Sequence, residues 1–577
     1  MQINLSTNKR FNWKVAKIGV IGPGIVGMPM AALLANARIK IGTDQPARVV
    51  VVQRNSPNSG WKVDAINRGK SVIGGIEPEL DAITESCVRE KLLSASWDYS
   101  VLADADVILV AIQTDKDGFG PDYKPLLDGL SNLARALQKK PPGNIPLVIF
   151  ESTLAPSSMS TVIKDHFASY GLTEGRDILL GNSPNRVMPG RLVERVTQSD
   201  KLVAGLHPET PKMIREIYRH IVTRGELHIT NSLSAEVTKT LENAYRDVRI
   251  AFTNEIVRYC DQEDIDFYSL RQQVNERLAQ EDKAGEDPNA VPSGGILIPT
   301  IGVGGHCLPK DGILLWWRKN ESGMDTSNSL ILHARRINDE APQQTIRLFE
   351  RSFGKIDGKN IAVLGAAYRF NSEDTRNSPA LQFALLCLEK GCHVSIHDPF
   401  VKRDDQNLQK YNLTQYFTND IKAALKDADY LVVATAHRYY YENVDYIISK
   451  ANRLAGVLDA GNAYKPGHVT SHNKKYAGIG RGSNKPDEEL VDFVFESFLA
   501  MEKGTANEIE QLCDFLNEHY APDDFNKIKF SEIQRLAASC STGCKIADGG
   551  PIDTIPEYRN FKSELVEKAY NGQLEKV

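Results

Sequence analysis

The sequence predicts an α/β protein with two Rossmann-like, doubly wound parallel-sheet domains joined by a central domain built on a long helix. Three observations lead to this prediction. A glycine-rich turn near the N-terminus stands between an apolar strand and a helix, and a similar strand–turn–helix–strand plan returns after residue 358. Between them lies a long helical pattern with 3.6-residue periodicity. With 577 residues, the chain is also too long for one hydrophobic core.

The first turn is Gly22-Pro23-Gly24-Ile25-Val26-Gly27, in the stretch VAKIGVIGPGIVGMPMAALLA. The first glycine permits the tight turn, the second lets a pyrophosphate approach the backbone, and the third lets the helix pack closely on the strand. The next strand, ARVVVVQR, ends in Gln53-Arg54, where an acid for the ribose 2′-hydroxyl is expected. Arg54 can instead meet a 2′-phosphate or point to solvent. We therefore expect NAD as the cofactor and leave NADP open.

The strands DVILVAI and PLVIFEST, with the helical segment SNLARALQ between them, continue the first sheet, and we place the NAD-binding domain at residues 1–210. Residues 232–262 then form a long helix that can join two domains and form a dimer seam. The segment IDFYSLRQQVNERL is helical, and EDKAGEDPNAVPSGG reads as a loop. We expect a central helical domain at 211–337. Apolar positions of the long helix include Leu241, Val248, Phe252 and Ile256.

The second nucleotide-binding pattern starts at KNIAVLGAAYRF. A strand, the Gly365 turn, the helix SPALQFALLCLEKG and the strand HVSIHDP repeat the first plan, and the sheet continues through ADYLVVATA and LAGVLDAGN. The spacing agrees, because Gly365 to Asp398 covers 398 − 365 = 33 positions and Gly22 to Arg54 covers 54 − 22 = 32. Only one of the three glycines is present, so this domain, at 338–500, suits a ligand smaller than a dinucleotide. Residues 501–577 form a helical, then loop-like, extension of unknown role.

Composition excludes some partners. A net charge of -5 argues against nucleic acid, and no window approaches 18 uncharged apolar residues, which argues against a membrane span. Eight cysteines without a paired framework indicate reduced thiols, and the N-terminus has no apolar signal core, so we expect a cytosolic protein. Cys540 and Cys544 stand four apart, but no second pair of ligands is near, and we expect no metal site.

The stretch GVGGHCLPKDG contains the most reactive candidate, Cys307. A cysteine becomes a good nucleophile when cations or helix dipoles stabilise its thiolate, and Lys310 and Lys239 are candidate cations. A metal site is disfavoured because His306 and Cys307 are adjacent without a ligand cluster, whereas a buried structural thiol remains an alternative. A nicotinamide-type site together with a thiol favours aldehyde oxidation. The thiol adds to the aldehyde, and the thiohemiacetal can lose a hydride to give a thioester.

Several separated motifs occur in a fixed order. They are Gly22 to Gly27, INRGKSVIGGIEPEL, ESTLAP, SPNRVMPG, AEVTKTLENAYR, GGHCLPKD, DTRNSPA and GIGR. In these motifs the span from about Lys14 to Arg481 resembles the UDP-glucose/GDP-mannose dehydrogenase family of nucleotide-sugar 6-dehydrogenases. The resemblance implies that a sugar 6-hydroxyl is oxidised twice with two NAD, through an aldehyde, a thiohemiacetal and a thioester that water hydrolyses. It also implies that the first lobe holds NAD, the second holds the nucleotide diphosphate, and the long helix makes a homodimer or a higher oligomer.

The resemblance implies specific residues. Cys307 matches the nucleophile, Lys239 and Asn243 lie four apart on one helix face to stabilise an oxyanion and hold water, Asp311 orients the lysine or the water, and Thr153 holds the cofactor or relays a water. A surface lysine with a capping asparagine is the plain alternative, and Glu151 could merely cap its turn. The expected cofactor-binding residues are Gly22, Gly24, Ile25, Val26, Gly27, Arg54, Thr114, Glu151, Lys310 and Arg376. The expected substrate-binding residues are Asn185, Arg186, Val187, Lys239, Asn243, Arg246, Gly304, His306, Tyr368 and Arg369.

Three positions depart from the pattern of the family. Asn185 stands where many members have an acid/base glutamate, so either Glu151 or Asp311 takes over or thioester hydrolysis is slow. Arg369 replaces a lysine but keeps the charge and can grip a pyrophosphate bidentately. Gly461 replaces the more usual arginine, which alters the sugar-side contacts.

His306 before Cys307, together with RVMPG, resembles the branch that acts on UDP-N-acetylhexosamines, so we expect UDP-N-acetylglucosamine or UDP-N-acetylmannosamine as substrate. UDP-glucose is the alternative within the family. Two other classes stay open. A one-step hydroxyacid dehydrogenase of the 6-phosphogluconate type would have no use for the thiol, and a non-catalytic nucleotide-sugar binder is favoured by Asn185 and Arg54.

Overall fold

The computed structural model describes residues 13–57, 59–74, 77–140, 145–187, 190–279, 295–540 and 544–574. Its contacts divide the chain into two compact units, and each is described by itself. The first unit contains residues 1–242, 314–324 and 511–545, and the second contains residues 243–313, 325–510 and 546–577. Three helices have residues in both units: α8 (Ser232–Gln262), α10 (Leu308–Glu321) and α19 (Glu488–Tyr520). The division into four consecutive domains stays a prediction, and nearly all of the expected loop EDKAGEDPNAVPSGG lies outside the described residues.

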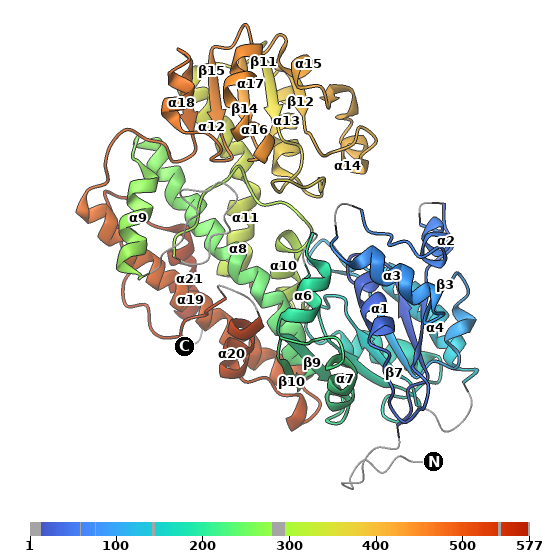
Figure 1. The fold of residues 1–577 in the computed structure, drawn as a ribbon. Helices are drawn as coiled ribbons and strands as arrows, with labels where there is room; N and C mark the ends of the chain where they lie inside the picture. The colour runs from blue at the N-terminus through green and yellow to red at the C-terminus, as the bar shows by residue number, and fades with distance from the viewer. Residues whose placement is uncertain are drawn as a thin grey trace. The chain divides into compact units, whose positions relative to one another are not determined.

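The first unit is built on an eight-stranded sheet with the order β10-β9-β8-β7-β4-β1-β2-β3 (Figure 1). Six parallel strands follow the Rossmann order 3-2-1-4-5-6, and β9 then joins β8 antiparallel while β10 joins β9 parallel. The sheet therefore continues beyond residue 210, because β10 pairs with β9. The strands are β1 (Lys17–Ile21), β2 (Arg48–Val52), β3 (Leu93–Ser96), β4 (Val107–Val110), β7 (Leu147–Phe150), β8 (Leu179–Asn182), β9 (Lys201–Gly205) and β10 (Leu227–Asn231), beside a small hairpin of β5 (Asp115–Asp117) and β6 (Gly120–Asp122).

Helices cover both faces of this sheet, which explains why its central strands are apolar at every position. In β2, Val49 and Val51 face one core, whereas Val50 and Val52 face the other. The first core is closed by α1 (Gly27–Asn36), α3 (Leu80–Arg89), α6 (Leu192–Gln198) and α7 (Thr210–Tyr218), and the second by α4 (Lys124–Leu137) and α5 (Lys164–Ser169), with α2 (Trp61–Asn67) near β3.

The second unit contains a six-stranded, fully parallel sheet in the order β13-β12-β11-β14-β15-β16, again 3-2-1-4-5-6. The prediction of a second Rossmann-like lobe is confirmed. Its strands are β11 (Asn360–Leu364), β12 (His393–His397), β13 (Phe417–Thr418), β14 (Tyr430–Val433), β15 (Gly456–Asp459) and β16 (Lys475–Gly478). Its helices are α12 (Ala341–Phe353), α13 (Pro379–Glu389), α14 (Gln406–Lys410), α15 (Ile421–Leu425), α16 (Arg438–Glu442), α17 (Val444–Lys450) and α18 (Pro466–Thr470).

The remaining helices confirm the predicted helical centre and tail. The long helix α8 covers the predicted residues 232–262, and Asn231 caps it by accepting a hydrogen bond from the Ser234 backbone at 2.7 Å. The centre also contains α9 (Phe267–Arg277), α10 and α11 (Leu330–Asp339). The tail contains α19, α20 (Phe530–Cys540) and α21 (Glu564–Leu574), with an irregular described stretch over 544–557.

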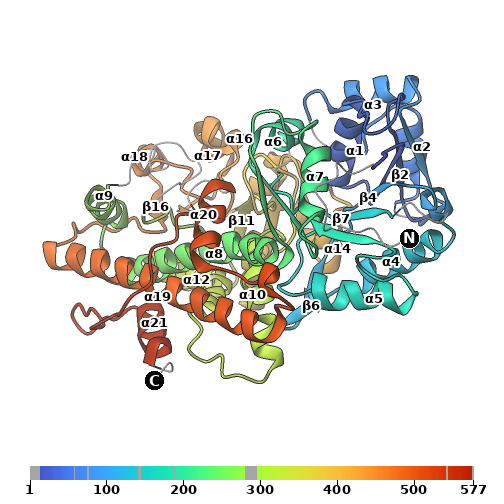
Figure 2. The same ribbon diagram turned by 90° about the horizontal axis from the view of Figure 1, so that it is seen from below.

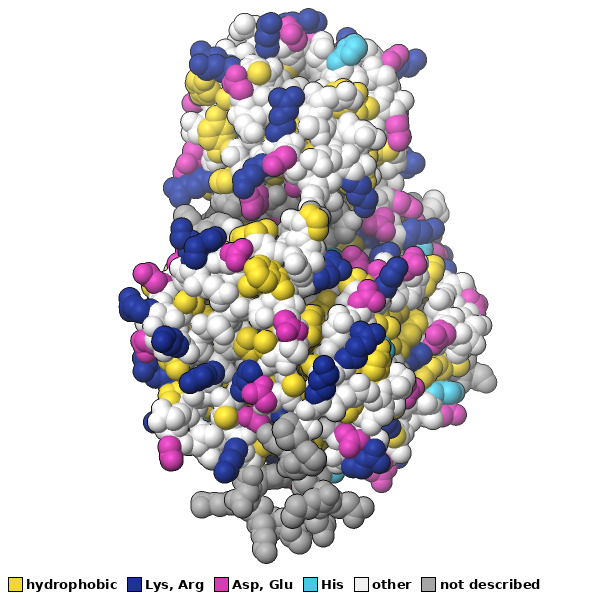
Figure 3. Space-filling view, turned by 90° about the vertical axis from the view of Figure 1, so that its right-hand side faces the viewer, with side chains coloured by type: hydrophobic (Ala, Val, Ile, Leu, Met, Phe, Trp, Pro, Cys, Tyr) yellow, Lys and Arg dark blue, Asp and Glu magenta, His cyan; other side chains and the backbone are white. Residues whose placement is uncertain are grey.

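Charged side chains of both signs are interspersed on the face drawn in Figure 3, without segregation into one basic or one acidic field. Within the described ranges, every helix is too short or too polar to cross a bilayer.

Candidate active site

The glycine turn of the first unit has the geometry that a dinucleotide needs. Gly22 adopts a φ of +88°, and a Cβ there would lie 2.8 Å from the Ala111 carbonyl oxygen. A Cβ on Gly27 would collide with the Gly22 carbonyl oxygen, so this glycine lets α1 approach β1 closely. A Cβ on Gly24 would meet nothing within 4 Å, which is the open side from which a pyrophosphate can reach the backbone at the start of α1. The residues present therefore fit NAD.

The other predicted cofactor residues of the first unit lie around the same sheet edge. Ile25 and Val26 are half-buried at the start of α1, and Arg54 is exposed directly after β2. The buried Thr114 donates from Oγ1 to the carbonyl oxygen of Thr153 at 2.6 Å, so the turns after β4 and β7 are tied together. The carboxyl ends of parallel strands meet at one edge of the sheet, where a ligand-binding crevice forms. These residues lie around that edge.

Glu151, predicted to contact the cofactor, has a fully enclosed side chain with three partners within the first unit. Its contact with the cofactor stays a prediction. Its carboxylate accepts hydrogen bonds from Lys201 Nζ at 2.8 Å, from the Tyr218 hydroxyl and from the Asn185 amide. Burial raises the pKa of Glu151 and lowers the pKa of Lys201, and their mutual attraction opposes both shifts. Glu151 therefore holds Asn185 in place by accepting the hydrogen bond from its amide.

Arg186, predicted to bind substrate, is held by a partner that sequence reasoning missed. Its guanidinium donates from Nε to the Glu242 carboxylate oxygens at 2.9 and 2.7 Å, and only 11% of its side chain is exposed. Glu242 belongs to α8, three residues after Lys239, so the motif AEVTKTLENAYR contained the signal. Lys239 itself is buried on α8, and Val187 is half-buried beside Arg186.

Glu236, one turn before Lys239 on α8, anchors the chain that follows Thr153. Its buried carboxylate accepts hydrogen bonds from the backbone of Ser157 and of Met159, both at 2.8 Å. Burial raises the pKa of Glu236 from 4.5 to about 8. Glu236 also stands in the motif AEVTKTLENAYR, but its role was not predicted, because its partners lie 79 and 77 positions away.

This carboxyl makes a prediction for stability against pH. The folded protein retains a proton that the unfolded chain releases above pH 4.5, so the contribution is complete below pH 4.5 and is lost as the pH rises to about 8. The loss amounts to about 5 kcal/mol at 1.36 kcal/mol per pH unit. We expect Glu236→Gln to flatten the fall in unfolding free energy between pH 5 and pH 8, measured by urea titration. The exposed Glu216→Gln on α7 is the control, and an equal slope in both variants would refute the assignment.

In the second unit, Cys307 stands at the N-terminus of α10. Its carbonyl accepts hydrogen bonds from the backbone of Lys310 and Asp311, at 3.1 and 2.9 Å, which opens the helix. All eight cysteines lie in the described part of the chain, and only Cys307 is exposed. An exposed thiol is accessible to a substrate, as a covalent nucleophile must be. The alternative of a buried structural thiol is therefore wrong.

Asp311 links two of the other predicted catalytic residues. It is fully buried on α10 and accepts a hydrogen bond from the Asn243 amide at 2.6 Å and an ion pair from Lys310 at 2.7 Å. Because Nδ2 of Asn243 donates to Asp311, its Oδ1 is the acceptor that remains for a water. Lys310 neutralises Asp311 in this arrangement, and its predicted contact with the cofactor stays a prediction.

The second Rossmann-like lobe holds the loop that carries Cys307. Gly305 donates its backbone N–H to the Arg376 carbonyl at 2.7 Å and accepts from the Asn377 amide at 2.9 Å. Side chains at Gly304 or Gly305 would collide with Tyr368, so both glycines are needed for the loop to lie on this ring. Hydrogen bonds to Asp374 raise the pKa of Arg376, and Cys307 raises it further, so the guanidinium lies within electrostatic range of the thiol.

Arg246 and Arg369, both predicted to bind substrate, lie close enough to repel each other. Burial lowers the pKa of Arg246, and the nearby Arg249 and Arg369 lower it further. An anionic ligand such as a diphosphate would relieve this repulsion. His306 is half-buried next to Cys307.

The Gly365 turn of the second lobe shows why this lobe does not suit a dinucleotide. The carboxylate of Asp398, at the end of β12, accepts hydrogen bonds from the backbone of Ala366 at 2.8 Å and Ala367 at 3.1 Å, directly after Gly365. It also pairs with His437 at 3.0 Å. A protein carboxylate thus occupies the backbone N–H groups that bind a phosphate in a Rossmann site.

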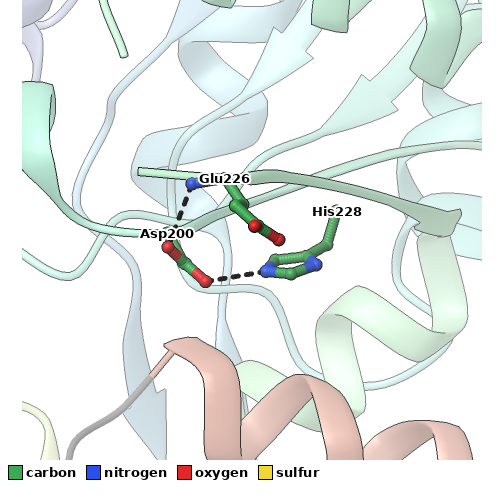
Figure 4. Close-up of side chains that lie close together, drawn as sticks. All are labelled: Asp200, Glu226 and His228. Atoms are coloured by element: carbon green, nitrogen blue, oxygen red, sulfur yellow. Dashed lines mark hydrogen bonds and ion pairs between the residues drawn. The ribbon is translucent and has the colours of Figure 1, made fainter. Parts of the chain in front are cut away.

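One group among the described residues brings three metal-type ligand atoms within 4.8 Å of one another, namely Asp200, Glu226 and His228 (Figure 4). Asp200 already pairs with the His228 ring at 2.8 Å and accepts the Glu226 backbone N–H at 3.0 Å, so it joins the starts of β9 and β10. This ion pair gives the cluster a structural role. That the chemistry needs no metal stays a prediction.

Two Rossmann-type sheets, a dinucleotide turn on the first, a filled turn on the second and an exposed helix-terminal thiol define an NAD-dependent dehydrogenase with a second nucleotide-binding lobe. Comparison with known families agrees along the chain. Models of the UDP-glucose/GDP-mannose dehydrogenase family match residues 16–222 as its NAD binding domain, 233–340 as its central domain and 362–466 as its UDP binding domain. The chain belongs to this family and is an NAD-dependent nucleotide-sugar dehydrogenase.

Individual relatives carry more specific names. The UDP-N-acetyl-D-mannosamine dehydrogenase of Pyrococcus horikoshii is 30% identical over 81% of this chain and 99% of its own. An NDP-N-acetyl-D-galactosaminuronic acid dehydrogenase of Ralstonia nicotianae is 28% identical over 73% and 91%. Among solved structures, an NDP-N-acetyl-D-galactosaminuronic acid dehydrogenase of Methanosarcina mazei is 31% identical, has a TM-score of 0.68 and covers 81% of this chain and 96% of its own.

Proposed function

We propose that this dehydrogenase oxidises the C6 hydroxyl of a UDP-N-acetylhexosamine to the carboxylate, with two NAD and with Cys307 as the covalent nucleophile. The observation that carries the proposal is the exposed thiol of Cys307 at the N-terminus of a 14-residue helix, on a loop held by Tyr368 and Arg376. The names of the relatives and His306 beside the thiol support an acetamido sugar.

The atoms and electrons of the reaction balance as follows. In each of the two oxidations the sugar carbon loses one hydride and its oxygen loses one proton. NAD, held at the glycine turn of the first unit, would supply the hydride acceptor. Between the two oxidations the sulfur of Cys307 forms a bond to the aldehyde carbon and gives a thiohemiacetal, which becomes a thioester on losing the second hydride. Water then cleaves the carbon–sulfur bond, releasing the carboxylate and restoring the thiol.

Thioester hydrolysis needs a held water, and the Asn243–Asp311 pair is the part of the second unit suited to hold it. The Asn243 amide is fixed by Asp311, which leaves its oxygen as an acceptor, and Asp311 is itself compensated by Lys310. Asn185 carries an amide where many family members have a glutamate, so the proposal assigns proton transfer to Asp311, with slow hydrolysis as the alternative. The predicted roles of Lys239 and Thr153 in oxyanion stabilisation and water relay are part of the same proposal.

Asp311→Asn tests this step directly. We expect a fall in turnover of about 10²-fold or more, the range for loss of a general acid or base, with the acyl group accumulating on Cys307. Intact-protein mass spectrometry after acid quenching detects the added mass. Asp325→Asn, an exposed aspartate of the same unit, is the matched control. Slow turnover without an adduct would place the role of Asp311 before the thioester.

The substrate is tested with a panel of UDP- and GDP-sugars, each with NAD and with NADP, followed at 340 nm with mass spectrometry of the product. We expect two NADH for each UDP-N-acetylhexosamine converted. Preference for UDP-glucose would place the chain in the UDP-glucose branch of the family. One NADH per sugar would contradict the four-electron reaction. Binding of the sugar without reduction of the cofactor would indicate a non-catalytic homologue. A cytosolic location is also proposed, supported by the absence of a paired cysteine framework in the sequence.

A further inference from the structure

The helix α8 carries the sequence pattern of a helix-pairing seam within the second unit. Tyr245, Phe252 and Tyr259 recur every seven residues, with Arg249 and Glu255 on the same side. A seven-residue repeat keeps such residues on one stripe of a helix, where they can meet another helix along their whole length. The sequence predicted a dimer seam on this helix without assigning it to a face.

The opposite side of α8 is already filled by the central domain. Asp247 pairs with Arg335 of α11 at 2.8 Å, and the Asn254 and Asn338 amides are hydrogen-bonded at 2.9 Å. Ala244 lies against Gly312 of α10. The aromatic stripe is therefore the face of α8 that these helices leave for a further partner.

The helix α19 occupies the first half of the stripe. The Phe498 ring meets Phe252 edge to face at 5.8 Å between centroids, and the Arg249 guanidinium lies 5.8 Å from the same ring. Tyr245 donates its hydroxyl hydrogen to Glu502 at 2.6 Å. Figures 1 and 2 both show α19 running beside α8.

The end of the chain occupies the second half. Phe561 stacks on Tyr259 with centroids 4.4 Å apart and ring planes at 13°, and Tyr558 meets the same ring edge-on. Glu255, buried on α8, accepts hydrogen bonds from the Ser563 hydroxyl at 2.7 Å and from the Glu564 backbone, where α21 begins. A carboxylate at a helix N-terminus is a favourable cap.

Within the extension α19 packs against α21, and α19 is also hydrogen-bonded to α11. The extension therefore covers the stripe as one layer. A Cβ on Gly504 of α19 would collide with Ala569 of α21, which shows how closely the two helices pack. Glu508 of α19 accepts from Ser329 and from the Leu330 backbone, at 2.7 and 2.8 Å, at the start of α11. Separating this layer from the rest of the unit would cost free energy, because each broken hydrogen bond would leave a buried polar group unsatisfied.

We propose that the C-terminal part of the second unit, residues 488–510 and 546–574, which includes most of the predicted extension, is a built-in partner for α8. It fills in cis the stripe that a second copy would otherwise use, so the chain does not self-associate through α8. Any homodimer of this protein uses another surface. This gives the extension a role, because it replaces a bimolecular helix contact by an intramolecular one that does not depend on protein concentration.

The first test asks whether the contact is made within one chain. In the full-length Tyr259→Cys/Phe561→Cys variant, mild oxidation with diamide joins the two new thiols. We expect a disulfide within a single chain, seen as a monomer-size band on a non-reducing gel and as a linked peptide in mass spectrometry, with the two single variants as controls. A covalent dimer linked between these positions would overturn the proposal, because the extension would then cover α8 of another copy.

The second test opens the stripe. Phe498→Asp places a charge against Phe252 and Arg249, whereas Leu499→Asp, the next residue on α19 and 41% exposed, leaves the contact intact. By sedimentation velocity across a hundredfold range of concentration, we expect the wild type and Leu499→Asp to keep one mass, and Phe498→Asp to associate further as concentration rises. Cross-links between the α8 helices of two wild-type chains would contradict the proposal, even if Phe498→Asp fails to fold.

Discussion

Cys307→Ser is expected to abolish formation of the uronate, lowering it at least about 10³-fold, because a hydroxyl replaces the only exposed thiol among the described cysteines. A serine alcohol has a much higher pKa than a thiol, and an ester is a poorer acyl intermediate for hydrolysis than a thioester. Any remaining reaction should stop at the aldehyde, with one NADH for each sugar released, or at an ester-like adduct, with two NADH for each sugar held on the enzyme. NADH at 340 nm and the masses of the product and of the intact protein measure this.

Cys392→Ser is the matched control. Cys392 is buried and its Sγ lies 3.1 Å from the Ile356 carbonyl, a hydrogen bond that a serine can also make. This variant should retain two NADH per sugar. If Cys307→Ser keeps the same stoichiometry and rate as Cys392→Ser, the thiol is not the nucleophile and the proposed covalent route is wrong.

The parts of the fold that sequence predicted well depend on local patterns. The turn from Gly22 to Gly27 and the strand before it can both be recognised from about a dozen consecutive residues. The second lobe was found by spacing, because the step from Gly365 to Asp398 matches the step from Gly22 to Arg54. What that spacing could not show is that Asp398 fills its own turn, since hydrogen bonds to Ala366 and Ala367 depend on how β12 ends beside β11.

The site was predictable where the residues are close in sequence and obscure where they are far apart. Asn243, Cys307 and Asp311 were found as motifs, and the structure joins Asn243 to Asp311. The partners of Glu151, Lys201 and Tyr218, were not predicted, because they lie 50 and 67 positions away in the sequence. The same holds for the C-terminal extension, whose contacts with α8 pair residues some 250 to 310 positions apart, such as Tyr245 with Glu502 and Glu255 with Ser563.

Glu151→Ala is expected to produce the largest loss of stability in the first unit. It removes the counter-charge of Lys201, whose side chain is only 5% exposed and which also donates to the Ser183 carbonyl at 3.0 Å. Leaving a buried charge unpaired costs about 3–5 kcal/mol. The same change frees the Asn185 amide, so turnover should fall as well. Urea unfolding of the free protein and of the protein with NAD measures the first effect.

The double variant Glu151→Gln/Lys201→Met separates charge from packing. It removes both buried charges at once, so its loss of unfolding free energy should be smaller than that of Glu151→Gln or Lys201→Met alone, giving a coupling of about 1 kcal/mol or more for residues in direct contact. It still lacks the carboxylate that accepts from Asn185 and Tyr218, so turnover should stay low while stability recovers. Recovery of both together would mean that Glu151 acts on catalysis only by holding the fold. If the double variant is no more stable than the single variants, the Glu151–Lys201 pair does not organise this part of the site.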